Sequence, residues 1–227
     1  MTVRSSRSQF PRRLALQEAR PPALMNEDRE AILSRVRGAL APLHRRAPLP
    51  DYDPEIAVLR QVLAGRDLAD LFAERLKRVG GLAFTDAAAL GAHLRAGGRR
   101  HGYCDPALRP ALAPHLGEGF TMETAFDRKR VDDYSFGITR AAGAIAESGS
   151  IILNDAATSS RLAALAPWVH VAVVRREDIF CDISQAVAAL GDDPNVIWCT
   201  GPSKTADVEG ILIEGVHGPG EQLALII

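Results

Sequence analysis

The residues best suited to chemistry lie near the C-terminus, in the polar loop Gly201-Pro202-Ser203-Lys204-Thr205-Ala206-Asp207. An apolar run that indicates a buried strand precedes this loop, and hydroxyl and carboxyl side chains typical of a helix start follow, so residues 206–213 are expected to be helical. Backbone N–H groups at a helix start, together with the ammonium group of Lys204, favour a bound anion such as phosphate or carboxylate. The pattern therefore predicts an anion-binding loop with the ligand-binding candidates Gly201, Ser203, Lys204 and Thr205.

The same loop has an alternative interpretation as a simple helix cap. Asp207 and Glu209 in the first helical turn would already complement the helix dipole, and they would repel an anion. Standard nucleotide-binding loops follow the patterns G-x-x-x-x-G-K-[ST] or G-x-G-x-x-G, and neither occurs in the chain. The anion site and the cap both stand as hypotheses, and no cofactor is predicted.

Glu147 is a second candidate, because it lies between an apolar stretch and a glycine turn in Glu147-Ser148-Gly149-Ser150. A carboxylate at the end of a strand, beside flexible backbone, can act as a nucleophile or a general base. Gly149 and Ser150 are then ligand-binding candidates. The structural alternative is that Glu147 caps the turn and that its neighbours satisfy the loop backbone.

His217 is the third candidate, in the segment Gly215-Val216-His217-Gly218-Pro219. Flanking glycine lets the backbone approach a ligand, and an imidazole can act as a general base or a hydrogen-bond donor near neutral pH. A purely structural hydrogen bond is the alternative. Asp207 precedes His217 by ten residues, and a carboxylate within reach would fix the imidazole tautomer. The catalytic candidates are therefore Glu147, His217 and Asp207.

The remaining polar residues give weaker signals. Arg140 and Asp133 are secondary site candidates, because charged residues of this kind are usually solvated. The other histidines do not have metal-ligand spacing, and no metal site is predicted. The three cysteines are isolated, which indicates reduced thiols and excludes a self-contained iron–sulfur cluster or a cysteine-ligated zinc site; they are Cys104, Cys181 and Cys199.

The elements that must position these residues alternate between strands and helices. Asp53 is expected to cap a helix that continues through Asp67 and stops at Gly80-Gly81, and Asp86 is expected to begin another helix. The apolar patterns predict strands at 82–84, 151–153, 169–174, 196–200 and 223–227. Such alternation implies parallel pairing and an α/β sheet covered on both faces. Parallel sheets gather the carboxyl ends of their strands on one edge, so the loop after residue 200, Glu147 and His217 are expected to converge on one crevice.

Length, composition and charge restrict the classes of function. The 227 residues are 47% hydrophobic and 24% charged, which is typical of a globular protein. The net charge of −1 argues against a nucleic acid or a membrane surface as the main partner. Residues 1–24 hold five arginines against one glutamate, a net +4, which leaves −5 for the rest. Residues 1–25 are expected to be a disordered arm, 26–80 a helical segment and 81–227 an α/β domain. No apolar run approaches the ~20 residues of a membrane span, and a cytoplasmic location is expected.

Three blocks together resemble the lactate-utilization protein C family, the small LUD-domain proteins of bacteria. They are the polar loop 201–209, the segment 215–219 and the central block Gly137-Ile138-Thr139-Arg140-Ala141 … Ala146-Glu147-Ser148-Gly149-Ser150-Ile151. The family often has threonine where Ser148 stands, a change that keeps the hydroxyl. The resemblance implies a Rossmann-like three-layer sheet of the NagB/RpiA/CoA-transferase-like fold.

The resemblance also implies a function. A lactate-utilization protein would act with iron–sulfur partner proteins in the oxidation of L-lactate to pyruvate, and this chain would itself bind a small carboxylate or a CoA-like ligand, or only organise the complex. Class I CoA-transferases place a catalytic glutamate in a similar Glu-x-Gly turn, so an independent acyl-CoA transferase or hydrolase using Glu147 is an alternative. Sugar-phosphate binding is another. Whether the chain is itself an enzyme stays open.

Overall fold

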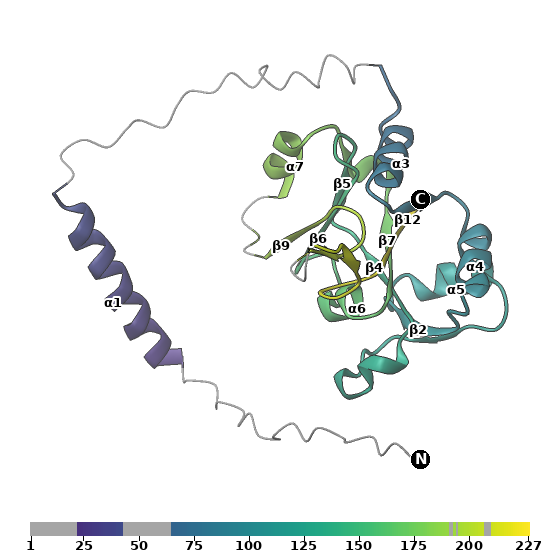
Figure 1. Ribbon diagram of the computed structural model, residues 1–227, viewed down its shortest axis with the longest axis horizontal. Coiled ribbons are helices and arrows are strands. Elements are labelled where there is room, and N and C mark those ends of the chain that lie inside the picture. The colour runs from purple at the N-terminus through teal and green to yellow at the C-terminus, as the bar shows by residue number, and fades with distance from the viewer. Residues whose placement is uncertain (1–21, 43–64, 191–192, 194, 207–209) are drawn as a thin grey trace, which may run out of the picture. The chain divides into compact units, whose positions relative to one another are not determined.

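The computed structural model describes residues 22–42, 65–190, 193, 195–206 and 210–227 (Figure 1). The chain forms two compact units, residues 1–53 and 54–227, and each is described by itself. Residues 1–21 of the expected arm and residues 43–64 of the expected helical segment lie outside the described residues. Among the described helices, none is long and apolar enough to cross a bilayer.

The first unit contains one described helix, α1 (Pro22–Leu40). Residues 22–25, which the sequence analysis placed in the arm, are helical. Proline is compatible with this start, because the first N–H groups of a helix have no intrahelical acceptor. The apolar side chains Ile32, Val36 and Leu40, at helical spacing, are all exposed.

The second unit is built on a six-stranded parallel sheet. Its strands, in spatial order, are β1 (Leu82–Phe84), β12 (Glu221–Ile226), β7 (Val169–Val174), β4 (Phe136–Arg140), β2 (His101–Cys104) and β3 (Thr121–Glu123). All neighbouring pairs in this sheet are parallel. The expected α/β architecture with parallel pairing is confirmed.

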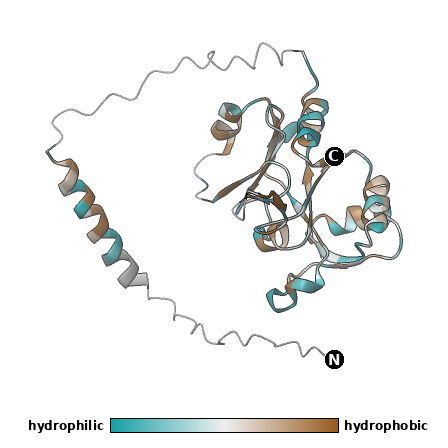
Figure 2. Cartoon of the chain, in the orientation of Figure 1, coloured by the Kyte–Doolittle hydropathy of each residue, from teal (hydrophilic) through white to brown (hydrophobic). Residues whose placement is uncertain are grey.

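Alternating side chains of the central strands feed two separate cores. In β7, Val169, Val171 and Val173 face one core, while Ala172 and Val174 face the other. A strand buried on both faces needs a continuous apolar run, and residues 169–174 are such a run. Figure 2 shows these hydrophobic residues along the strands at the centre of the domain. The sheet is therefore the middle layer of three.

Helices α4 (Ala87–Ala96) and α5 (Arg109–Leu116) cover one face of the sheet, through leucines that belong to the same core as Val171. Asp86 caps α4, because its carboxylate accepts the amide hydrogens of Ala88 and Ala89. This cap was expected from the sequence, since an aspartate just before an alanine-rich run is a preferred N-cap.

Helix α3 (Leu68–Arg78) packs on the opposite face. The sequence pattern predicted a helix running through this position from Asp53, whereas Asp67 is the N-cap of α3 and accepts the amides of Ala69 and Asp70. Phe72 and Leu76 are fully buried in the core that also contains Ala172. The α/β unit therefore begins before residue 81, the boundary suggested by the sequence, and it includes α3.

A second, four-stranded sheet completes this third layer. It consists of β8 (Ile179–Phe180), β5 (Gly143–Ile145), β6 (Ser150–Asn154) and β9 (Val196–Cys199), in that order. Two α-helices, α6 (Arg161–Leu165) and α7 (Ile183–Leu190), and two 3₁₀ helices, η2 (Arg128–Asp133) and η3 (Arg176–Asp178), make up the other helical elements described in this unit. Figure 1 shows this sheet and α7 on the side of the parallel sheet away from α4 and α5.

The helix expected at residues 206–213 is not formed over the described part of that range, so this prediction was wrong. The chain instead makes a hairpin in which β10 (Lys204–Thr205) pairs antiparallel with β11 (Ile213–Glu214). Lys204 and Glu214 are directly opposite each other and form an ion pair of 3.3 Å. Gly210, with φ +72°, takes a left-handed conformation that breaks a helix. Asp207 and Glu209 lie outside the described residues.

His170 is a buried polar group in the centre of the sheet. Its Nε2 lies 3.0 Å from the Thr139 hydroxyl and its Nδ1 lies 3.1 Å from Oε1 of Gln222. The Gln222 oxygen can only accept, so Nδ1 carries the hydrogen and Thr139 donates to Nε2. Burial lowers the pKa of His170 to about 4, against the opposing effect of the Gln222 hydrogen bond. The ring is therefore neutral in the folded protein.

We expect this histidine to make the domain sensitive to acid. Between pH 6.5 and about 4 the unfolded chain binds the proton while the folded protein does not, so the free energy of unfolding falls as pH falls. The loss expected from this group is about 2–3 kcal/mol. Urea unfolding at pH 7 and pH 4.5 measures it, with His170→Met as the comparison. The variant should lose less stability than wild type over this interval, and equal losses would contradict the assignment.

Candidate functional site

The predicted Glu147 turn packs against the backbone of α3. Gly149 has φ +68°, and a Cβ there would collide with the backbone of Arg75 and Leu76. The amide of Glu147 donates to the carbonyl of Cys181. The Glu147 side chain is half-buried and has no hydrogen bond or ion pair with another described residue. The turn is thus tightly held, while its carboxylate is unpaired within the described structure.

A row of hydroxyl groups connects this turn to the end of β9. Ser148 Oγ lies 2.7 Å from Ser150 Oγ, and Ser150 Oγ lies 2.7 Å from Thr200 Oγ1. Ser150 is buried, and the hydroxyls on either side satisfy its hydrogen bonds. Gly201 follows Thr200, and its Cβ position is blocked by the carbonyl of Val79 at the end of α3. Two of the predicted polar blocks therefore meet beside the C-terminal end of α3.

The other predicted residues lie beside the amino ends of the parallel strands, not at their carboxyl ends. The amide of Ser203 donates to the carbonyl of Pro219, which precedes β12 by two residues. The ammonium of Lys204 lies beside Gly80, just before β1, and pairs with Glu214. His217, in the loop leading to β12, is exposed. Thr205 belongs to β10 of the hairpin.

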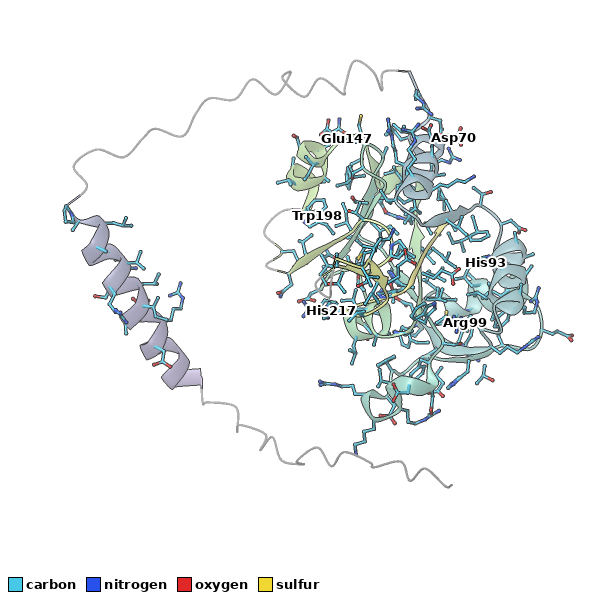
Figure 3. The ribbon with its side chains drawn as sticks, in the orientation of Figure 1. Asp70, His93, Arg99, Glu147, Trp198 and His217 are labelled. Atoms are coloured by element: carbon cyan, nitrogen blue, oxygen red, sulfur yellow. The ribbon has the colours of Figure 1, made fainter. Side chains whose placement is uncertain are left out.

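The structure thus brings Gly149, Ser150 and Gly201 together around α3, and it joins Ser203 to the loop that contains His217. Figure 3 shows Glu147 near α7 and α3, well separated from His217 beside the β10–β11 hairpin. The partner expected for His217, Asp207, lies outside the described residues. Catalytic roles for Glu147, His217 and Asp207 stay predictions.

Thiol and metal chemistry are not indicated among the described residues. Burial raises the pKa of Cys104 to about 12 and that of Cys199 to about 11, so both thiols are protonated at neutral pH. A thiol in that state is a poor nucleophile. No group of three or more histidine, cysteine, aspartate or glutamate side chains within the described ranges is arranged to hold a metal ion.

The carboxyl edge of the parallel sheet carries an open cavity of about 440 Å³, which we call the carboxyl-edge cavity. This edge is where open α/β sheets bind ligands. The lining consists of two arginines, one aspartate and several small or apolar side chains. These residues are Leu108, Arg140, Ala141, Ala142, Ala157, Val173, Arg175, Asp178 and Ile227. The volume falls within the range of small-molecule sites.

Arg140, the last residue of β4, is the principal cationic group of this cavity. Its Nε donates to Oδ2 of Asp105 at 2.8 Å, and Asp105 is fully buried while Arg140 is 44% exposed. Burial raises the pKa of the Asp105 carboxyl, but the hydrogen bonds from Arg140, the Ala107 amide and the Ser159 hydroxyl outweigh it and hold the pKa below its usual value. The ionised carboxylate of Asp105 therefore holds the guanidinium of Arg140 in position.

The terminal amino groups of Arg140 have no hydrogen-bond acceptor among the described residues. Arg175, by contrast, is bound by both carboxylate oxygens of Asp178, at 2.8 and 3.3 Å. Arginine recognises carboxylate and phosphate through paired N–H donors. Arg140 is therefore held by a fully buried carboxylate and keeps both terminal amino groups available to an anion, whereas the carboxylate of Asp178 lines the cavity beside Arg175 and would repel one.

The sequence analysis ranked Arg140 below the loop residues because a charged residue of this kind is usually solvated. Its partner Asp105 is 35 residues away in sequence. The available signal was its position as the last residue of β4, at the carboxyl end of a parallel strand. Asp133, the other secondary candidate, pairs with Arg130 in η2 on the surface.

The fold and this cavity define an α/β protein with a ligand crevice at the carboxyl edge of a parallel sheet. Comparison with protein-family models matches residues 109–227 to the LUD domain. This match covers more than half of the chain, and the chain belongs to the LUD domain family.

Several curated relatives carry the name lactate utilization protein C. The Deinococcus radiodurans protein is 32% identical over 123 residues, covering 51% of this chain and 58% of the relative. The Bacillus licheniformis protein is 31% identical over 107 residues, with 44% and 45% covered. The Bacillus subtilis protein is 30% identical over 107 residues, with the same coverage. The chain therefore spans about half the length of the curated relatives it matches.

Among solved structures, the chain is similar to a DUF162 family protein from Deinococcus radiodurans. The TM-score is 0.52 at 24% identity, covering 70% of this chain and 95% of the other. At this identity the likeness concerns the fold, and it agrees with the α/β architecture described above.

Proposed function

We propose that the chain acts in lactate utilization, and that its carboxyl-edge cavity binds a carboxylate through Arg140. The shared name of its relatives supports the first part of this proposal. The carboxylate site is supported by the geometry of Arg140. The buried Asp105 holds this guanidinium in place, and the terminal amino groups of Arg140 stay available. Lactate and pyruvate each present one carboxylate of the kind that such a group binds.

The proposal assigns electron transfer to other chains. Oxidation of L-lactate to pyruvate releases two electrons, which an acceptor must carry away. The three cysteines are too few for the four ligands of an ordinary iron–sulfur cluster. Iron–sulfur partner proteins would therefore supply the redox centres, and this chain would supply the carboxylate site.

Growth of a deletion strain tests the proposed function. A strain without the gene for this chain should grow poorly on L-lactate, because the lactate-oxidising system would be incomplete, and should grow normally on pyruvate, the product of that step. Growth rates on the two carbon sources give the result, and a plasmid copy of the gene should restore growth on lactate.

Normal growth of the deletion strain on lactate would contradict a role in lactate utilization. It would then favour the independent acyl-CoA transferase or hydrolase suggested by the Glu147 turn, whose half-buried carboxylate has no partner among the described residues. A thioester trapped on Glu147 and cleavable by borohydride would support that second function.

A further inference from the structure

A second cavity of about 430 Å³ adjoins the carboxyl-edge cavity, and we call it the apolar chamber. Leu108, Val173 and Ile227 line both cavities, so the two meet at these side chains. The chamber lies between the sheet and the helices α4 and α5. Its remaining lining residues are Thr85, Asp86, Ala87, Ala88, Ala111, Leu112, His115 and Leu225. The two cavities lie next to each other along the edge of the sheet, with these three side chains at their boundary.

Strand register explains why this edge has a polar end and an apolar end. Arg140 of β4 is paired with Val173 of β7, and Val173 is paired with Leu225 of β12. Residues paired in register on parallel strands project from the same face of a sheet. Arg140, Val173 and Leu225 therefore lie side by side on one face of the sheet. They span two strand spacings, which is about 10 Å.

The charges around the two cavities favour one negative group on the ligand. The guanidinium of Arg140 stands at one end. At the other end the carboxylate of Asp86 accepts hydrogen bonds from the amides of Ala88 and Ala89. This carboxylate lines the chamber and would repel a second anionic group. A ligand with one carboxylate and an uncharged remainder matches this distribution.

The size of the two cavities exceeds what lactate needs. Lactate has six non-hydrogen atoms, and at roughly 30 Å³ for each water-sized group it would fill about 180 Å³. The carboxyl-edge cavity alone measures about 440 Å³, and the apolar chamber adds a similar volume. Lactate bound at Arg140 would leave the apolar chamber unfilled.

We infer that this site takes a monocarboxylate with an apolar tail, such as a longer 2-hydroxy acid. The carboxylate pairs with Arg140, and the tail lies over Val173 and Leu225 towards Leu112 of α5. This inference rests on the proposed carboxylate site and adds the chemical class of its ligand. Burial of a tail methylene strengthens binding by about fourfold for each group removed from water.

Calorimetric titration of the full chain with a homologous series tests this inference. The series is lactate, 2-hydroxybutyrate, 2-hydroxyhexanoate and 2-hydroxyoctanoate. The affinity should rise by about fourfold per methylene until the chamber is filled. Ala111 is an exposed residue of α5 that lines the chamber, so Ala111→Phe should remove this dependence on chain length. Ala89→Phe, at an exposed position of α4 outside the lining, is the matched control and should keep the dependence.

The outcomes separate the inference from the proposal beneath it. An affinity that is the same for lactate and for 2-hydroxyoctanoate would overturn the apolar tail and leave the carboxylate site standing. A rise with chain length that Ala111→Phe does not affect would also overturn it, because the tail would then lie elsewhere. Failure of every member of the series to bind would overturn the carboxylate site itself, and the inference with it.

Discussion

Replacing Gly149 with alanine should destabilise the α/β unit by about 2–5 kcal/mol. A non-glycine residue at φ +68° costs about 1–2 kcal/mol, and overpacking a tight contact adds about 1–3 kcal/mol or more. The added Cβ would meet backbone atoms of Arg75 and Leu76, which cannot rotate away as a side chain can. Chemical unfolding of the variant measures the loss.

Gly98→Ala is the matched control for this substitution. Gly98 has a similar φ of +71°, but a Cβ there would have no atom within 4 Å. The control isolates the conformational penalty and should lose only about 1–2 kcal/mol. Equal losses in the two variants would show that the close contact between the glutamate turn and α3 contributes little to stability.

Replacing Arg140 with glutamine should weaken carboxylate binding by about 10- to 100-fold. A hydrogen bond to a charged group contributes about 1.5–3 kcal/mol, and 1.4 kcal/mol corresponds to a factor of ten. Calorimetric titration with a 2-hydroxy acid measures this loss. Arg175→Gln should weaken binding much less, because the carboxylate of Asp178 neutralises that guanidinium and lies beside it in the cavity lining.

The single Arg140 variant also leaves Asp105 buried without its cationic partner, so reduced stability could be mistaken for a lost contact. Adding Asp105→Asn removes the buried charge and should restore stability. Binding should not return in this double variant, because the guanidinium is still absent. Recovery of binding together with stability would assign Arg140 a structural role only.

Local signals in the sequence were sufficient for much of the framework. Asp86 begins a helix as expected, and the strands predicted at 82–84 and 169–174 have those bounds. These elements follow from side chains adjacent in the chain, a capping carboxylate or a continuous apolar run, and such patterns do not depend on distant contacts.

Elements decided by distant partners could not be predicted in the same way. The segment after Gly201 has the residue types of a helix start, yet it forms a hairpin in which Lys204 faces Glu214. The role of Arg140 depends on Asp105, which follows a different strand. Cross-strand pairing and ion pairs of this kind arise only once the sheet is assembled.

The central claim is that a carboxylate site in this chain is needed for lactate utilization. The most direct test is to complement the deletion strain with the Asp105→Asn, Arg140→Gln variant and to measure its growth. With variant protein at the wild-type level, we expect growth on pyruvate and no restored growth on L-lactate, because the chain is present and folded but cannot hold the carboxylate. Growth on L-lactate at the wild-type rate would contradict the account.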